Sequence, residues 1–378
     1  MKYLLVMHYA PPHIGGMETV LARQAHSLRE LGHEVTIYTC RNDSKLPLNE
    51  NTKDYRIVRA RSLNFIEKKF NITYPIISPT QILSVFRLVK SSDVVHIHDV
   101  FYMSSHLAGI AARLINKPYY LTQHVAMVDH RNKFVMLGQK IVYATFGKLL
   151  FMGAKKIVVY NVNVKNFLLK LGVKEDKILL TNNGIDTEYF SPVNVDQRIK
   201  LRNKYDVPTN VPVIIFVGRL VSKKGYDVVY DANSDKHFTM IVGTGKVPNR
   251  MVQTKNIKFF GPATHAQLLD LYRLSDIFVI PAIGEIFTLV MQEAMACGLP
   301  IITTNDKGYD EYDLNKNLIR FIKSNAIDLR KNINLLLSDP SLLAQMSSYS
   351  RELAECQFSW SKNYEREYAI YDDSGLMI

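Results

Sequence analysis

Short apolar runs alternate with amphipathic stretches along the chain, and this alternation predicts strands and helices that follow one another in turn. Strands are expected at residues 2–8, 34–40, 55–60, 93–98, 118–124, 155–160, 177–186, 213–220, 240–245, 258–262, 276–280, 299–304 and 319–322. Helices are expected at residues 17–31, 82–90, 289–297, 326–337 and 341–356. Such an alternation builds doubly wound α/β domains with parallel sheets.

The chain is long enough for two or three domains, and we expect two. A loop-rich linker running from Ser191 and Pro192 to about Pro212 interrupts the alternation. The first domain is therefore assigned to residues 1–190 and the second to residues 191–357.

Composition indicates a globular protein of a reducing compartment. Hydrophobic residues make up 47% of the chain, yet no run approaches the length of a membrane span, and residues 1–8 are too short for a signal peptide. Three cysteines, Cys40, Cys297 and Cys356, are an odd number without metal-type spacing. We therefore expect a cytoplasmic location, no zinc site and neither a span nor a signal peptide.

The net charge of +12 is carried almost entirely by the first half of the chain. Residues 1–190 hold 25 Lys and Arg against 14 Asp and Glu. A basic half is typical of proteins that bind nucleic acid, an anionic membrane surface or an acidic substrate. No nucleic-acid-binding module accompanies the charge, so we expect no nucleic-acid partner.

Residues 281–304 predict a strand, a loop and a helix leading into a further strand. Thr288 is the expected N-cap and Gly298 the helix stop. Ligands of such units lie against the free N–H groups of the helix N-terminus, which favours anions. Glu285 and Glu293 nevertheless flank this end, and carboxylates accept hydrogen bonds from hydroxyls. A ligand that carries both phosphates and hydroxyls satisfies both features.

Two further loops have the composition of anion sites. Arg219 ends a predicted strand and Lys224 follows five residues later, so both cations can meet one anion, although a solvated surface pair is the alternative. Gly15 and Gly16 follow the first strand, where the backbone of glycine can approach a ligand closely. Taken alone, a Gly-Gly pair is more often an ordinary turn than a phosphate loop.

Three histidines lie at the ends of predicted strands. His96 and His98 alternate along one strand and share a face, so a bound metal and an ordinary pair of hydrogen-bonded side chains are both open. His124 ends the strand at residues 118–124, where a neutral imidazole can both donate and accept a hydrogen bond.

Basic and aromatic residues mix in two segments, at residues 131–156 and 56–70. The first can form a basic amphipathic helix at a membrane surface, or a core helix with a solvated basic face. The second segment, with Arg56, Arg59, Arg61 and Phe65, favours the first alternative. A lipid surface or a lipid-linked substrate is therefore a candidate partner.

Several of these motifs resemble those of one enzyme family. Glu285 and Glu293, within G-E-I-F-T-L-V-M-Q-E-A-M-A-C-G-L-P, are similar to the signature of the retaining GT-B glycosyltransferases of family four, the group 1 type. The P-x-x-G-G-x-E loop at residues 12–18 and G-R-L-x-x-x-K-G at residues 218–225 resemble further motifs of that family. Ile286 and Thr288 depart from the pattern, since the family commonly has glycine there, and they restrict the loop.

The resemblance implies a GT-B fold, in which two doubly wound Rossmann-like domains face each other across a cleft. It also implies that a final helix, residues 358–378, crosses back to the first domain. The first domain would bind the acceptor and the second a nucleotide sugar. The implied reaction is the transfer of a hexose from a UDP- or GDP-linked donor to a glycan or lipid-linked acceptor, with retention at the anomeric carbon.

Roles for individual residues follow from the same resemblance. Glu285 would bind the donor sugar and Glu293 the ribose, while His124 would reach the sugar from the first domain. The amides of Phe287, Thr288 and Leu289 would bind the diphosphate, together with the side chains of Arg219 and Lys224. Gly261 would border the base. Gly15 and Gly16 would contact the diphosphate or the acceptor. No cofactor is expected, and because the sequence has no Asp-x-Asp triplet, no obligatory divalent metal.

Two alternatives remain open. A GT-B nucleotide-sugar epimerase would form product without an acceptor. A non-catalytic basic module that binds membranes or nucleic acid would explain the charge, but it would leave Glu285, Glu293, Arg219 and Lys224 without a role.

Overall fold

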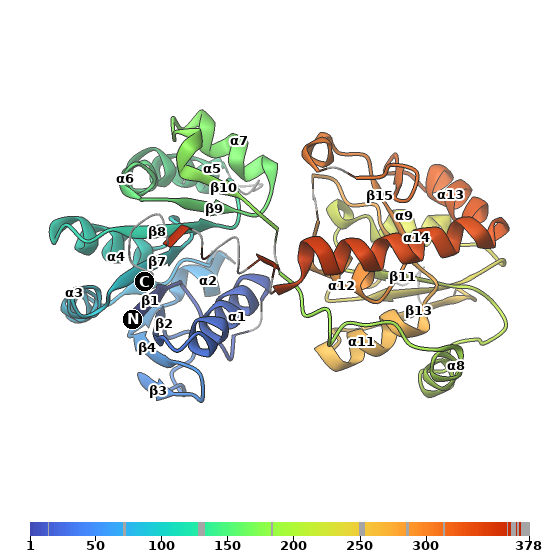
Figure 1. Ribbon diagram of the computed structural model, residues 1–378, viewed down its shortest axis with the longest axis horizontal. Coiled ribbons are helices and arrows are strands. Elements are labelled where there is room, and N and C mark those ends of the chain that lie inside the picture. Colours follow the sequence, from blue (N-terminus) through green and yellow to red (C-terminus); the bar gives the residue numbers. More distant parts are fainter. Residues whose placement is uncertain are drawn as a thin grey trace. The chain divides into compact units, whose positions relative to one another are not determined.

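The structure, a computed structural model, consists of two compact units that each contain a parallel sheet. It describes residues 1–13, 15–70, 73–127, 133–182, 184–248, 254–284, 287–312, 314–360, 362–363, 368 and 370–371. The N-terminal unit is formed by Met1–Thr181 with Tyr364–Ile378, and the C-terminal unit by Asn182–Asn363 (Figure 1). Each unit has its own hydrophobic core.

The N-terminal sheet has the strand order β10-β9-β8-β7-β1-β2-β4-β3, and only β3 runs antiparallel. Its strands are β1 (Lys2–Val6), β2 (Glu34–Cys40), β3 (Asn49–Asn51), β4 (Arg56–Ala60), β7 (Val94–His98), β8 (Tyr119–Gln123), β9 (Ile157–Val159) and β10 (Ile178–Leu180). A small antiparallel ribbon pairs β5 (Ser62–Leu63) with β6 (Ile76–Ile77).

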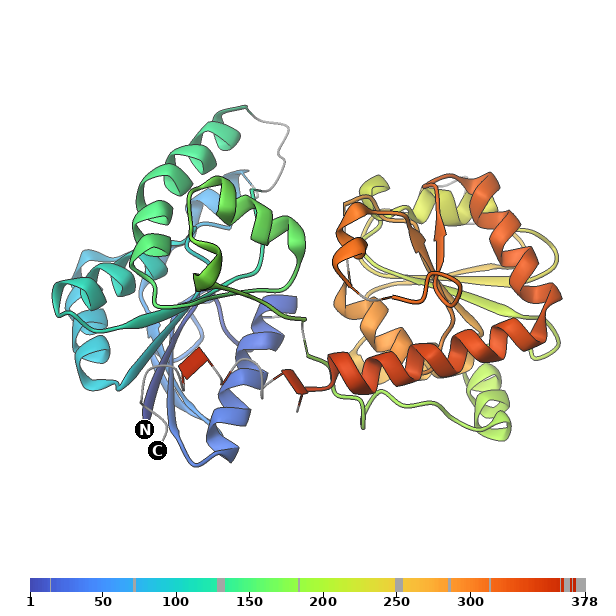
Figure 2. The same ribbon diagram turned by 45° about the horizontal axis from the view of Figure 1, so that its top comes forward.

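Helices lie on both sides of this sheet (Figure 2). They are α1 (Gly16–Glu30), α2 (Phe65–Phe70), α3 (Ile82–Ser91), α4 (Met103–Leu114), α5 (Lys133–Val142), α6 (Lys148–Gly153) and α7 (Val162–Lys170). A π-helical segment, η2 (Tyr143–Gly147), joins α5 to α6. Because helices cover both faces, central strands such as β7 are buried at every residue.

The C-terminal sheet is entirely parallel, with the order β13-β12-β11-β14-β15-β16. Its strands are β11 (Val213–Val217), β12 (Phe238–Val242), β13 (Ile257–Phe260), β14 (Ile277–Ile280), β15 (Ile301–Thr304) and β16 (Arg320–Ile322). Its helices are α8 (Val195–Lys204), α9 (Tyr226–Ala232), α11 (His265–Leu274), α12 (Leu289–Ala296), α13 (Ala326–Ser338) and α14 (Pro340–Leu353), with short turns η4 (Ser222–Lys224), η5 (Lys307–Glu311) and η6 (Ala354–Phe358).

The predicted α/β class and parallel sheets are confirmed, while several predicted bounds differ from the structure. The strand expected at residues 177–186 contains only Ile178–Leu180, and β3, β5 and β6 were not predicted. The units divide at Thr181 rather than at residue 190. Asn363 Nδ2 donates to the Asn182 carbonyl oxygen, and Phe190 packs into the C-terminal core, so the segment from Asn182 onward belongs to that unit.

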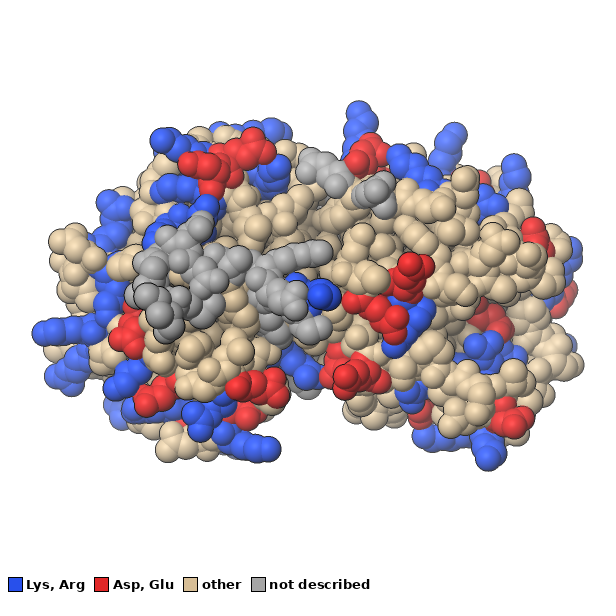
Figure 3. Space-filling view, in the orientation of Figure 1, with Lys and Arg blue, Asp and Glu red and all other residues tan. Residues whose placement is uncertain are grey.

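The surface of the N-terminal unit is rich in Lys and Arg side chains (Figure 3). The prediction that Arg59 belongs to a basic-aromatic surface segment is wrong, because its side chain is 1% exposed and paired with Glu50. Its guanidinium also donates to the carbonyl oxygens of Pro47 and Pro11. A buried cation of this kind is tolerated because its donors are satisfied. Phe65 of the same segment is exposed.

By length and composition, one helix among the described residues could cross a membrane, which differs from the expectation of no span. It is Lys133–Gly153, the continuous run of α5, η2 and α6, with a mean hydropathy of 1.2. Core helices of folded domains have similar compositions. Tyr143, Leu150 and Phe151 are buried in the N-terminal core, so the helix is packed as part of this unit.

The C-terminal segment is anchored in the N-terminal unit by a buried polar contact. The Tyr371 hydroxyl lies 2.5 Å from His96 Nδ1, and Thr122 Oγ1 lies 2.7 Å from His96 Nε2. The Tyr371 ring also packs edge-on against Tyr3 and Tyr120. A residue near the chain end thus completes the hydrogen bonding of a side chain in the central sheet.

We expect Tyr371→Phe to lower the free energy of unfolding by about 1–3 kcal/mol, because it leaves a buried ring nitrogen of His96 without a partner. The urea midpoint measures this loss. Tyr189→Phe, at a half-exposed tyrosine, is the control. Equal midpoints for the two variants would show that the contact does not anchor the segment.

Candidate active site

Both sheets contain a point at which the strand order reverses, and the candidate residues gather there. The chain adds strands on one side of β1 and then continues with β7 on the other; β11 and β14 have the same relation. Ligands of open α/β sheets bind beyond the carboxyl ends of the strands at such reversals. Ligands are therefore expected at the loops after β1, β7, β11 and β14.

In the C-terminal unit, the loops after β11 and β14 are bound to each other. The Ile283 N–H donates to the Lys223 carbonyl oxygen at 3.0 Å. Gly225 adopts a φ of +78°, and a Cβ at this position would lie 2.6 Å from the Pro281 carbonyl oxygen. Close backbone packing therefore places the loop of Arg219 and Lys224 directly beside the loop that leads into α12.

The two predicted cations occupy this loop. Arg219 is exposed, whereas Lys224 is half-buried. A Cβ on Gly218 would lie 3.9 Å from Lys224 Cδ, so the lysine side chain runs back toward the end of β11. Both residues thus lie at the carboxyl edge of the sheet, as predicted.

Thr288 is the N-cap of α12, as predicted, but its side chain makes no capping hydrogen bond. Leu289 begins the helix, and the Met291 and Gln292 N–H groups donate to the Thr288 carbonyl oxygen. The N–H groups of Leu289 and Val290 are left without an acceptor within the helix. The positive end of the helix dipole lies at the same place. This helix end is therefore suited to an anion.

Phe287 supports the loop in a way that sequence reasoning missed. Its φ is +44°, in the left-handed region that costs a non-glycine residue about 1–3 kcal/mol. Its ring is buried against Tyr309, Tyr312 and Phe358, and Gln292 Nε2 donates to its carbonyl oxygen at 3.0 Å. These contacts hold the backbone that precedes α12 in one conformation.

Glu293 projects from α12 toward α11 and is buried. The Tyr272 hydroxyl donates to Glu293 Oε2 at 2.9 Å. Burial raises the pKa of Glu293 to about 7, and the hydrogen bond from Tyr272 opposes this shift. The carboxyl group is therefore held by its neighbour before any ligand arrives.

Glycines line the remaining carboxyl edge of this sheet. A Cβ at Gly243 would lie 1.9 Å from the Gly218 carbonyl oxygen, so the ends of β11 and β12 are in direct backbone contact. The predicted base contact, Gly261, follows β13 and has open space where a Cβ would be. The predicted donor-sugar residue Glu285 lies outside the described residues, as does its neighbour Ile286.

In the N-terminal unit, the predicted Gly-Gly pair begins α1. Gly15 is the N-cap and the exposed Gly16 is the first helical residue. A Cβ on Gly15 would lie 2.3 Å from Glu18 Oε2, and Glu18 Oε1 lies 2.6 Å from His13 Nδ1. The glycine therefore makes room for a buried carboxylate in the first turn of the helix.

His124 belongs to a chain of hydrogen bonds across three elements. His98 Nε2 lies 2.9 Å from the Gln24 amide oxygen, and His98 Nδ1 lies 3.0 Å from His124 Nε2. Since the amide oxygen only accepts, His98 donates through Nε2 and accepts at Nδ1 from the Nε2–H of His124. Burial lowers the pKa of His124 to about 3, so its ring is neutral and its Nδ1 is an acceptor.

Asp99 fixes the backbone on which His124 stands. Asp99 Oδ1 accepts hydrogen bonds from Gln123 Nε2 and from the backbone N–H group of His124, while Oδ2 has no partner among the described residues. Asp99 has a φ of +56°. Burial raises its pKa to about 7, against the effect of these donors.

The metal interpretation of His96 and His98 is not supported by their contacts. Both ring nitrogens of each residue lie within hydrogen-bonding distance of protein groups. Within the part of the chain that the structure describes, no three His, Cys, Asp or Glu side chains form a group that could hold a metal ion. The two histidines are members of the hydrogen-bond network.

A further member of this edge was not predicted. His8 follows β1, is buried and stacks on Tyr102 with ring centroids 3.7 Å apart. Burial lowers the pKa of His8 to about 3. Its place after the first strand, two residues beyond β1, was the only available signal. Gln24 and Tyr272 gave no signal, because their partners His98 and Glu293 are distant in sequence. Gln292 was missed although the Phe287 carbonyl oxygen is only five residues away.

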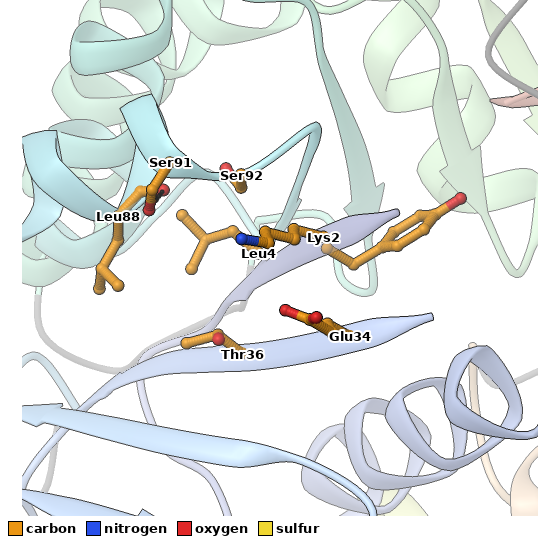
Figure 4. Close-up of a pocket in the computed structure, with 8 residues that line it drawn as sticks. Lys2, Leu4, Glu34, Thr36, Leu88, Ser91 and Ser92 are labelled. Carbon is orange, nitrogen blue, oxygen red and sulfur yellow. Dashed lines mark hydrogen bonds between the residues drawn. The ribbon is translucent and has the colours of Figure 1, made fainter. Parts of the chain in front are cut away.

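A small recess of about 60 Å³ lies elsewhere in the N-terminal unit (Figure 4). It is lined by residues such as Lys2 and Glu34, at the amino ends of β1 and β2, and by Ser91 and Ser92. This is the sheet edge opposite to the one that carries the candidate residues. The recess is therefore no part of the candidate site.

Comparison with known proteins agrees with this geometry. Residues 197–353 match the glycosyl transferases group 1 family, and residues 14–189 match the glycosyltransferase family 4. The chain belongs to the group 1 glycosyltransferases of family four. It is an α/β protein of the GT-B fold, as the sequence resemblance implied.

Relatives of this glycosyltransferase cover nearly its whole length. It is 23% identical to an uncharacterised glycosyltransferase of Methanocaldococcus jannaschii, over 98% of each chain. It is 22% identical to a D-inositol 3-phosphate glycosyltransferase of Corynebacterium aurimucosum, over 95% of this chain and 91% of the relative. The structure of Anabaena HepE in complex with UDP is similar with a TM-score of 0.77, 16% identity and full coverage of both chains.

We expect the stability of the glycosyltransferase to carry a pH-dependent contribution from Asp99. Its pKa is 3.8 in the unfolded reference and about 7 in the folded chain, so this contribution is largest below pH 3.8 and is lost as the pH rises through 7. Asp99→Asn keeps the Oδ1 acceptor without the charge. The free energy of unfolding of the variant, relative to that of the wild type, should rise by at most about 4 kcal/mol between about pH 4 and pH 8.

Urea unfolding across this pH range measures the difference between the two proteins. The lowered histidine pKa values make both proteins less stable in acid, and the comparison cancels that common effect. Asp310→Asn, at an exposed carboxylate, is the control. A difference that does not change with pH would contradict the assignment.

Proposed function

We propose that the protein transfers a hexose from a nucleoside-diphosphate sugar to a glycan or lipid-linked acceptor, with retention at the anomeric carbon and without an obligatory divalent metal. The C-terminal unit binds the donor and the N-terminal unit the acceptor. The observation that supports this most is the contact between two loops at the reversal of the C-terminal sheet. It brings the loop of Arg219 and Lys224 beside the loop that leads into the N-terminus of α12.

The donor diphosphate suits this arrangement. Two cations and a helix N-terminus offer charge-assisted and backbone hydrogen bonds to phosphate oxygens. Negative charge grows on the diphosphate as the sugar leaves, so the same groups lower the barrier of the reaction. Because the protein itself supplies these positive groups, no metal ion is required in this proposal.

Three side chains bind the hydroxyl groups of the donor in this proposal. Glu293 accepts from the ribose, and Tyr272 holds its carboxyl group in place. Glu285 orients the sugar rather than attacking it. His124 Nδ1 accepts a hydrogen bond from a hydroxyl of the transferred sugar. The hydrogen-bond chain through His98 and Gln24 holds the His124 proton on Nε2, so Nδ1 carries none.

A UDP- or GDP-linked donor is proposed, and the structural neighbours support UDP as the first to test. HepE has been crystallised with UDP and with UDP-glucose. The acceptor is expected at the reversal of the N-terminal sheet, beside Gly16, where α1 begins. A cytoplasmic location is part of the proposal, since nucleotide sugars are the donor.

An epimerase would use the same donor loops, and product formation without an acceptor would distinguish it. A non-catalytic membrane-binding module would neither bind a nucleoside diphosphate tightly nor turn over a nucleotide sugar. Transfer that depends on an added acceptor excludes both.

We expect the double variant Arg219→Ala, Lys224→Ala to bind the preferred nucleoside diphosphate at least tenfold more weakly, because each charge-assisted hydrogen bond contributes about 1.5–3 kcal/mol. The preferred nucleotide is first found by a thermal-shift panel of UDP, GDP and ADP, since a ligand of the folded state raises its melting temperature. Calorimetry then measures the affinity.

Lys223→Ala is the matched control, because Lys223 is an exposed cation in the same loop. It should leave the affinity within about twofold, as expected for a surface charge. Unchanged affinity of the double variant, or an equal loss in the control, would contradict the proposed diphosphate site.

A further inference from the structure

The continuous helix Lys133–Gly153 exposes an apolar stripe on one side. Phe134 is 84% exposed, and Leu137 and Ile141 are each 54% exposed. These positions are three and four residues apart, so they lie on one side of the helix. In Figure 2 the amino-terminal part of this helix projects beyond the other elements of its unit.

The opposite side of the helix is part of the fold. Tyr143, Leu150 and Phe151 are buried in the N-terminal core, and a Cβ on Gly109 of α4 would lie 2.7 Å from Leu150 Cγ. The stripe is therefore not left over from poor packing. The helix has one side for the core and a second apolar side that faces solvent.

The charged residues of the helix itself are all lysines. Lys133 and Lys140 lie four and three residues from Leu137, so they flank it on the helix surface, and Lys148 follows on the same helix. Residues 130–174 contain nine Lys and Arg and no Asp or Glu. A lysine beside apolar residues can extend its stem along them and keep its ammonium group in water.

We propose that this helix face docks the enzyme onto an anionic lipid bilayer, with Phe134, Leu137 and Ile141 inserted among the acyl chains and the lysines at the phosphate headgroups. An apolar stripe with flanking cations is the pattern of helices that lie in a membrane interface. The inference goes beyond the transfer reaction, because it concerns where the enzyme works. It also favours a lipid-linked acceptor over a soluble one.

Other occupants fit the face less well. Two copies of the chain would bring two strongly basic surfaces together without a compensating carboxylate. A polynucleotide would meet the lysines, but the aliphatic side chains of Leu137 and Ile141 would have no partner in it, since bases stack on aromatic and guanidinium groups. Of these three occupants, only a bilayer satisfies both the charge and the apolar stripe.

Sedimentation with vesicles tests this docking on the full chain. We expect binding to vesicles of equal parts phosphatidylcholine and phosphatidylglycerol, and much weaker binding to phosphatidylcholine alone. The double variant Phe134→Ser, Leu137→Ser should bind the anionic vesicles at least roughly tenfold more weakly, because two large side chains no longer insert. Lys133→Gln with Lys140→Gln should weaken binding most at low salt.

The matched control is Leu83→Ser with Leu114→Ser, at two exposed leucines of α3 and α4 that are 67% and 69% exposed. This variant should bind like the wild type. A second readout is the fluorescence of Phe134→Trp, which should shift to the blue on anionic vesicles. The wild-type chain, whose single tryptophan is Trp360 in the C-terminal unit, supplies the background.

Three results would overturn the proposal. The first is a wild-type protein that does not bind anionic vesicles, or a Phe134→Trp signal that they do not change. The second is an equal loss of binding in the control variant. The third is a serine variant that loses self-association or polynucleotide binding while its vesicle binding stays at the wild-type level. None of these readouts requires catalysis, so they remain separate from a failure of the proposed reaction.

Discussion

The positions of the candidate site residues depend on the reversal of strand order in each of the two large sheets. Loops that leave neighbouring strands at this point bring helix N-termini and strand ends to one edge, where backbone N–H groups lack partners. In the C-terminal unit the edge carries Arg219 and Lys224 in a loop that packs on the loop leading into α12, and these cations suit phosphate oxygens. In the N-terminal unit it carries neutral histidines and a carboxyl group, which suit hydroxyls rather than phosphates.

The glycines make the positive edge possible. Gly218, Gly225 and Gly243 stand where a Cβ would meet backbone or neighbouring side-chain atoms, so the loops can approach each other closely. Phe287, unlike these glycines, has a side chain that disfavours its left-handed backbone conformation, and the burial of its ring holds it there. Rigidity of this loop is useful, because preorganised donors need not be reoriented during the reaction.

The helix Lys133–Gly153, which we propose docks on a membrane, adds a second property to the same unit that is proposed to bind the acceptor. Its buried side belongs to the N-terminal core, whereas its other side exposes Phe134, Leu137 and Ile141. An enzyme that finds its acceptor in a bilayer gains from being held at the surface, since docking raises the effective concentration of the two partners.

Sequence reasoning reached the elements and the positions of the candidate residues, because apolar runs and glycine loops are local signals. It placed Arg219 at the end of a strand with Lys224 in the loop that follows, and the structure has both in the loop after β11. It also predicted Thr288 as the N-cap of α12, as the structure has it. It could not find that Tyr272 holds Glu293 or that Gln24 holds His98, because these partners meet only in the folded chain. The burial of Arg59 was missed for the same reason.

A crystal structure of the full chain with its preferred nucleoside diphosphate is the decisive test of the proposed donor site. We predict phosphate oxygens within hydrogen-bonding distance of the Leu289 backbone N–H and of the Arg219 and Lys224 side chains. The ribose hydroxyls should contact Glu293. A diphosphate bound away from the N-terminus of α12, with Arg219 and Lys224 directed elsewhere, would contradict the account.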